Sequence, residues 1–169
     1  MARNYKTKEF AVVEYVKRRF ADLDWVCDKQ VLDGCSRRRP DLLCDFGDQV
    51  LIVEVDENQH TDYDCSCENK RLMELSQDVG HRPIVFVRFN PDAYMASSAG
   101  PAGPRSVTSC WGNNKSGVCV VKKTKTREWA WRLEALAQQV EYWATRANRT
   151  TKTVEVVQLF YDGHSLPEA

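Results

Sequence analysis

Hydrophobic residues recur along segment 7–21 with the spacing of an amphipathic helix. Val12, Val13, Val16 and Phe20 fall on one side of that helix, and Thr7 stands where a side chain can cap the first turn. The same spacing predicts helices over 66–79, which Gly80 follows at the expected C-terminal position, and over 126–147.

Shorter apolar runs predict strands. The β-branched run at 49–56 indicates a central strand, and Gly47-Asp48 favours a hairpin turn that joins it to 41–46. A further apolar strand is expected at 83–89, and the helix before it favours a crossover that leaves 49–56 and 83–89 parallel. Extended segments are also expected at 24–31 and 153–160.

The segment between the apolar strands and the last helix has a different composition. Gly, Ser, Pro and Ala dominate 95–104, which predicts a loop or insertion, and Cys110 to Lys123 favours a hairpin around 113–117. We expect one domain over 1–169, with core motifs in 7–92, an insertion at about 95–125, and a helix and strand in 126–161. The predicted fold class is α/β, a mixed central β-sheet flanked by helices.

Composition limits the setting in which this domain works. No run of about 18 apolar residues predicts a membrane span, and the N-terminal residues lack the apolar stretch of a signal peptide. We therefore expect an intracellular protein of the cytoplasm or nucleus, not a secreted or membrane protein. Seven cysteines, an odd number, are then expected to be reduced, buried or metal-bound.

The charge is balanced overall and unevenly distributed along the chain. The net charge is zero, yet 37–39 and 122–125 are basic clusters and 41–68 is acidic. An enzyme that cuts DNA needs both, because cations contact the phosphates and carboxylates hold a metal ion at one of them.

The acidic stretch suggests specific chemistry. Glu54 and Asp56 are two apart on a predicted strand, so they share a face, and the hairpin brings Asp41 close to both. Carboxylates crowded on a buried strand repel each other, and a hard cation such as Mg²⁺ or Mn²⁺ relieves that repulsion. His60 follows the strand, where an imidazole can move a proton near neutral pH.

These segments resemble the PD-(D/E)xK nuclease superfamily, in particular its very-short-patch-repair-like branch with the EDxHD homing endonucleases. The resemblance is carried by 25–30, 39–43 (RPDLL), 53–60 (VEVDENQH), 68–71 (ENKR) and 80–89, within about half of the chain. It implies a restriction-endonuclease-like fold. It also implies metal binding by Asp41 and Glu54. Asp56 stands where the family has lysine, a departure that His60, or alternatively Lys70, would compensate.

Further residues around the acidic cluster are candidates for the site. The branch uses a glutamate on its first helix, and Glu9 is the preferred match because it lies on the core side, whereas Glu14 does not. Lys70 and Arg71 are candidate DNA-binding residues, with an intrahelical Glu68–Arg71 ion pair as the alternative. Arg37, Arg38 and Arg39 adjoin Asp41 and are expected to contact the DNA backbone, or to form a solvated surface run.

Two features outside the cluster leave alternatives open. Cys65 and Cys67 lie where repair-branch relatives hold a structural zinc, although buried free thiols are the plainer interpretation. The insertion with Trp111, Lys115 and 122–125 is a candidate DNA-contacting hairpin, whereas the tryptophans of 129–143 favour core packing over base stacking.

The sequence therefore predicts a Mg²⁺- or Mn²⁺-dependent DNA endonuclease, nicking as a monomer or cutting both strands as a homodimer, in homing, repair or viral DNA processing. The catalytic residues would be Asp41, Glu54, Asp56, His60 and Glu9, with the first three as metal ligands. A catalytically inactive, nuclease-like DNA-binding module and an RNA nuclease are the alternatives.

Overall fold

A computed structural model describes residues 7–27, 40–60, 65–97 and 101–163, without the side chains of 60 and 65–69. The chain forms the following elements: α1 (Thr7–Arg19), β1 (Trp25–Cys27), β2 (Leu42–Asp45), β3 (Val50–Val55), η1 (Glu57–His60), α2 (Cys65–Asp78), β4 (Ile84–Phe89), β5 (Tyr94–Ala96), β6 (Arg105–Val107), β7 (Trp111–Asn113), β8 (Cys119–Val121), η2 (Lys123–Lys125), α3 (Thr126–Ala144), η3 (Arg146–Asn148) and β9 (Val154–Leu159).

The main sheet has five strands in the order β1-β2-β3-β4-β9. The first three are antiparallel neighbours, whereas β3, β4 and β9 run parallel, so the sheet is mixed. The predicted hairpin and the parallel crossover through α2 are both confirmed. Gly47, with φ of 87°, makes the hairpin turn in a backbone conformation that glycine adopts without strain.

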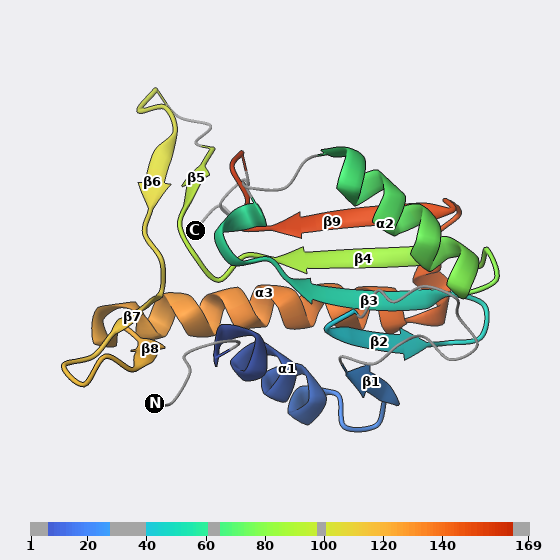
Figure 1. Ribbon diagram of the computed structural model, residues 1–169, viewed down its shortest axis with the longest axis horizontal. Helices are drawn as coiled ribbons and strands as arrows, with labels where there is room; N and C mark the ends of the chain where they lie inside the picture. The colour runs from blue at the N-terminus through green and yellow to red at the C-terminus, as the bar shows by residue number, and fades with distance from the viewer. Residues whose placement is uncertain (1–6, 28–39, 61–64, 98–100, 164–169) are drawn as a thin grey trace.

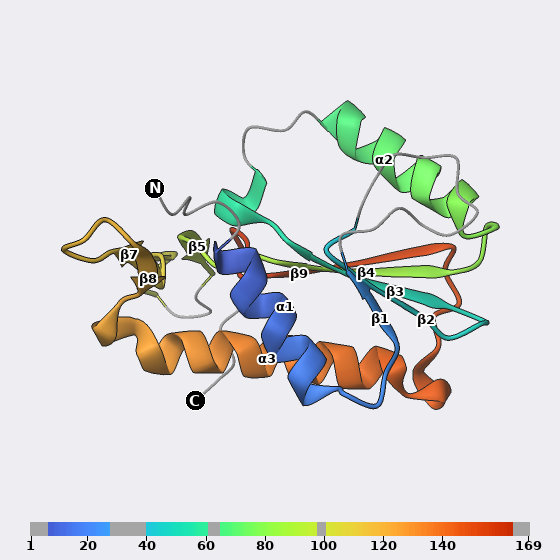
Figure 2. The same ribbon diagram turned by 60° about the horizontal axis from the view of Figure 1, so that its bottom comes forward.

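Helices cover both faces of this sheet, as Figures 1 and 2 show. Val50, Ile52 and Phe86 pack on one face with Leu75 of α2. Leu51, Val53 and Val87 pack on the other face with α1 and α3. Alternate residues of β3 thus enter two separate cores, and all six of its residues are buried. The prediction of an α/β fold with a helix-flanked mixed sheet is confirmed.

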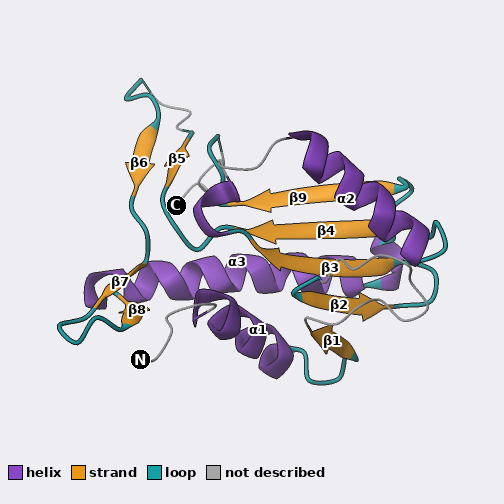
Figure 3. Cartoon of the chain, viewed as in Figure 1, coloured by secondary structure: helices purple, strands orange, loops and turns teal. Residues whose placement is uncertain are grey.

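The insertion contains more regular structure than its composition suggests. Segment 95–104 was predicted as a loop or insertion; its first two residues lie in β5, which pairs with β6 just beyond the segment. These strands have three residues each, too short for an alternating pattern to stand out beside Gly and Pro. The predicted hairpin at Cys110 to Lys123 is confirmed by the pairing of β7 with β8. Figure 3 shows both small pairs at one end of the main sheet.

Helix ends differ slightly from the predicted ranges, since α1 ends at Arg19 and α3 at Ala144. Among the described residues, no helix has the length and apolarity needed to cross a bilayer.

Candidate active site

The register of the β2–β3 hairpin brings the predicted acidic residues together. Leu42 pairs with Val53, so Asp41 and Glu54 are the next residues at the end of the ladder. Glu54 and Asp56 lie on the α2 face, because they follow Ile52 at two-residue steps. We call Asp41, Glu54 and Asp56 the acidic cluster.

Asp41 begins the cluster at the edge of the protein interior. Its Oδ2 accepts a hydrogen bond from the Val55 backbone N–H at 2.8 Å, which fixes the carboxylate beside β3. Burial raises the pKa of Asp41 to about 6, and the negative charges of Glu9 and Asp56 act in the same direction. The bond from Val55 and the charge of Arg71 oppose that rise. Keeping Asp41 ionised near neutral pH therefore costs the native state free energy.

Glu54 has a cationic partner on the neighbouring helix. The guanidinium of Arg71 donates from Nη1 to Oε2 at 2.6 Å and from Nη2 to Oε1, a bidentate pair. Burial nevertheless raises the pKa of Glu54 to about 7; Arg71 lowers it, while Asp56 and Asp41 raise it. Leu72, Phe86 and Arg88 line a narrow crevice around the Glu54–Arg71 pair.

Asp56 lies deeper than the other two acids. It is 0% exposed, and its Oδ2 accepts hydrogen bonds from Arg88 Nε at 2.5 Å and from the Tyr161 hydroxyl. These bonds link the end of β3 to β4 and to the segment after β9. Asp56 was predicted as a metal ligand and catalytic residue, but in this structure its carboxylate holds three parts of the fold together.

The turn after β3 has an unusual backbone. Asn58 and Gln59 have φ of 53° and 57°, a left-handed conformation that costs free energy in residues other than glycine. The Asn58 N–H donates to Asp92 Oδ2 at 3.1 Å, and Gln59 exchanges hydrogen bonds with Asp162. His60 is the last residue of this turn, η1. Tertiary contacts thus impose the backbone that carries the predicted proton-transfer residue.

Glu9 was predicted as a catalytic residue on the core side of the first helix. It is half-buried on α1, and its charge raises the pKa of Asp41. Lys70 is exposed on α2. Arg71 was predicted as a DNA contact or an intrahelical partner of Glu68, whereas its guanidinium binds Glu54.

Several predicted residues lie outside what the structure describes. These are Arg37, Arg38 and Arg39 entirely, and the side chains of His60, Cys65 and Cys67. Their predicted roles stay predictions. In contrast, Arg88 and Tyr161 were missed, because an arginine on an apolar strand and a tyrosine far along the chain carry no local signal.

The donor chemistry at Asp41 and Glu54 suits a hard cation. Mg²⁺ in proteins is commonly held by one or two carboxylates, with water and phosphate oxygens as its other ligands. Burial raises the pKa of both carboxylates, and nearby acidic side chains add to the rise, so a bound cation would favour their ionised forms. Within the described residues, however, no three His, Cys, Asp or Glu side chains lie close enough to hold a metal, and Arg71 already engages both oxygens of Glu54.

The tryptophans of the insertion and α3 serve the core. Trp111, suggested as part of a DNA-contacting hairpin, is 7% exposed and meets Trp129 edge-on with ring centroids 5.3 Å apart. Its ring is therefore unavailable for stacking on a base. The expectation that the tryptophans of α3 pack in the core is confirmed at Trp129.

Comparison with known proteins adds no assignment to this geometry. No protein-family model matches the chain, and no curated protein matches its sequence.

Proposed function

We propose that the chain is a metal-dependent DNA endonuclease with a restriction-endonuclease-like fold. The observation that supports this most is that Asp41, Glu54 and Asp56 lie at the open end of the β2–β3 hairpin, with Glu9 close enough to raise the pKa of Asp41. Burying several like charges at one place costs free energy, so such a cluster is a functional-site candidate on physical grounds.

In this proposal Asp41 and Glu54 would hold Mg²⁺ or Mn²⁺, which when bound stabilises charge on the phosphate. Glu9 adds negative charge beside Asp41. His60 would move a proton to or from the reacting oxygens, because an imidazole is suited to proton transfer near neutral pH. Asp56 would fix the end of β3 through Arg88 and Tyr161.

A plasmid-nicking assay tests the proposal. We expect the wild-type chain to nick supercoiled DNA with Mg²⁺ or Mn²⁺, and Asp41→Asn or His60→Ala to lower the rate by about 10²-fold or more. Glu9→Gln should lower it less. Glu14→Gln on the same helix is the matched control, because Glu14 is 40% exposed and its near partner is Lys17, at 3.7 Å.

A non-cleaving DNA-binding module is the second candidate. The observation that favours it is that Glu54 and Asp56 are each neutralised by an arginine, Arg71 and Arg88. Wild-type protein that binds DNA and does not nick it with either metal would support this candidate over the enzyme. Cleavage of RNA alone would indicate an RNA nuclease instead.

A further inference from the structure

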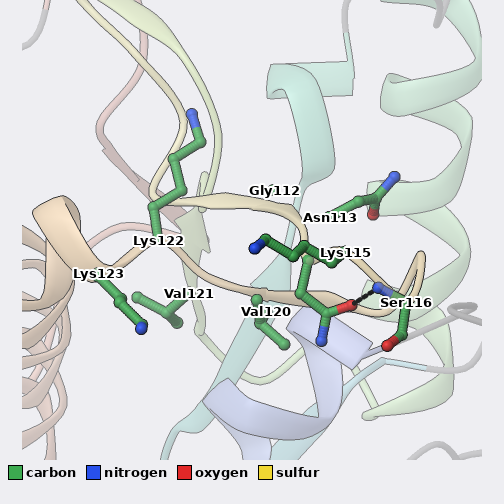
Figure 4. Close-up of a pocket in the computed structure, with 9 residues that line it drawn as sticks. Gly112, Asn113, Lys115, Ser116, Val120, Val121, Lys122 and Lys123 are labelled. Atoms are coloured by element: carbon green, nitrogen blue, oxygen red, sulfur yellow. Dashed lines mark hydrogen bonds between the residues drawn. The ribbon is translucent and has the colours of Figure 1, made fainter.

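The segment from Arg105 to Arg127 carries six basic residues and no acidic residue, in a chain whose net charge is zero. Three of these residues, Lys115, Lys122 and Lys123, line an open groove on the β7–β8 hairpin, together with Gly112 to Asn114 and Ser116. We call this feature the lysine groove. Figure 4 shows the three lysine side chains leaving the turn and the end of the hairpin.

These lysines differ from most basic residues elsewhere in the structure. Each of the following pairs joins a Lys or Arg to a nearby carboxylate: Lys8–Asp92, Arg71–Glu54, Arg82–Asp45, Arg88–Asp56, Arg149–Asp48 and Lys152–Glu155. In the described part of the chain no carboxylate forms an ion pair with Lys115, Lys122 or Lys123, and the neighbouring Lys125 binds Glu128 at 3.2 Å. The groove thus gathers positive charge that the fold does not use.

The groove is held in a fixed shape. Asn114 Oδ1 accepts hydrogen bonds from the N–H groups of Ser116 and Val118 at 2.9 and 3.0 Å, which locks the turn that carries Lys115. Lys122 N donates to Cys110 O at 2.8 Å. The stem of Lys122 lies over Gly112, where an added Cβ would come within 3.0 Å of Cε.

The base of the hairpin is connected to the turn that carries His60. Ser109, at the base of the hairpin, donates to Asp92 Oδ1 at 2.7 Å, while Asn58 of η1 donates to Asp92 Oδ2 at 3.1 Å. One buried carboxylate therefore ties the hairpin to the turn that follows β3. Figure 1 shows the hairpin at the end of the sheet where β3, β4 and β9 end.

We infer that the lysine groove binds the phosphate backbone of duplex DNA and positions the duplex across the acidic cluster. Several lysines on one hairpin, without ion pairs to the described carboxylates, suit a ligand with regularly spaced phosphates. Such contacts position a protein on DNA without reading its sequence. The inference rests on the proposed DNA-directed function. Measuring DNA binding without metal tests the groove separately from cleavage.

The test measures duplex DNA binding by fluorescence anisotropy in EDTA over a range of salt concentrations. The variant combines Lys115→Gln, Lys122→Gln and Lys123→Gln. The control combines Lys17→Gln, Arg18→Gln and Lys152→Gln, which changes the net charge equally on surfaces away from the groove. We expect the groove variant to bind roughly tenfold more weakly near 0.1 M salt and to lower the slope of log K against log salt by about 2 to 3. The control should change little, and circular dichroism should show both variants folded.

The outcomes separate the groove from the chemistry. Loss of binding in the groove variant supports the inference even if the wild type nicks nothing, a result that would overturn only the endonuclease. Wild-type protein that does not bind duplex DNA, or a groove variant that binds like the control, would overturn the inference. Loss of RNA binding with DNA binding unchanged would also overturn it.

Discussion

The acidic cluster and the lysine groove hold opposite charges in opposite ways. Glu54 and Asp56 are 3% and 0% exposed, and each is bound by an arginine from a neighbouring element. Lys115 and Lys123 are exposed and form no ion pair with any described carboxylate. Removing one member of a charge pair buried inside the fold destabilises the native state, whereas unpaired surface charge contributes little to folding and remains available for a ligand.

The largest effect is expected from removing Arg88, the cationic partner of Asp56. We expect Arg88→Met to lower the free energy of unfolding by about 3–5 kcal/mol, because a carboxylate without exposure loses its cation. Urea denaturation at pH 7 measures this. The double variant Asp56→Asn with Arg88→Met should recover much of the loss, and a single variant as stable as wild type would show that Asp56 needs no cation.

Arg71 allows the metal hypothesis to be tested within the same comparison. We expect Arg71→Gln to lower the free energy of unfolding in EDTA by about 2–3 kcal/mol, since Glu54 loses a bidentate partner. Mn²⁺ should then stabilise this variant more than wild type, because the cation no longer competes with the guanidinium. A free Mn²⁺ concentration 100 times the dissociation constant would raise the free energy of unfolding by about 2.7 kcal/mol.

Melting temperatures of wild type and Arg71→Gln, each with and without Mn²⁺, measure how much the metal stabilises each protein. Arg82→Gln is the control. Arg82 binds the exposed Asp45 at 2.6 Å, away from the acidic cluster, so its loss should not alter the response to metal. Equal stabilisation of wild type and Arg71→Gln by Mn²⁺ would argue against Glu54 as a cation ligand.

What could be predicted from the sequence depended on local patterns. The hairpin at Gly47-Asp48 fixes which residues face each other, so the proximity of Asp41 to Glu54 followed from alternation and one turn. The partners of those acids did not follow. Arg71 comes from a helix 17 residues on, and Tyr161 reaches Asp56 across 105 residues, contacts that exist only after the sheet has formed.

The backbone conformation of the turn after β3 could not be predicted from the sequence either. Asn58 and Gln59 adopt positive φ, although neither is glycine, since Asp92 and Asp162 hold them there. The basic cluster at 122–125 was visible in the sequence, but the absence of an ion pair at Lys122 and Lys123 in the described structure was not, because pairing depends on which carboxylates the fold brings near.

The pH dependence of stability sharpens the contrast on the acidic side. Asp41 has its pKa raised to about 6 from an ordinary value near 4, so its contribution to native-state stability is present at low pH and is lost as pH rises through 6. We expect Asp41→Asn in EDTA to be more stable than wild type by about 1–2 kcal/mol at pH 7.5, allowing for partial exposure. The difference should shrink towards pH 4. Urea denaturation across this range measures it, and a constant difference would contradict the raised pKa.

The smallest expected effect lies on the basic side. Replacing Lys115, Lys122 and Lys123 by glutamine should change the free energy of unfolding by no more than about 0.5 kcal/mol, because no ion pair is lost and mutual repulsion is relieved. Urea denaturation of this variant and of Arg88→Met in the same buffer compares the lysine groove with the acidic cluster. A loss of several kcal/mol would mean that the lysines support the hairpin itself. A near-zero change, together with weaker DNA binding, would mean that these charges serve a ligand, as Arg71 and Arg88 serve the fold.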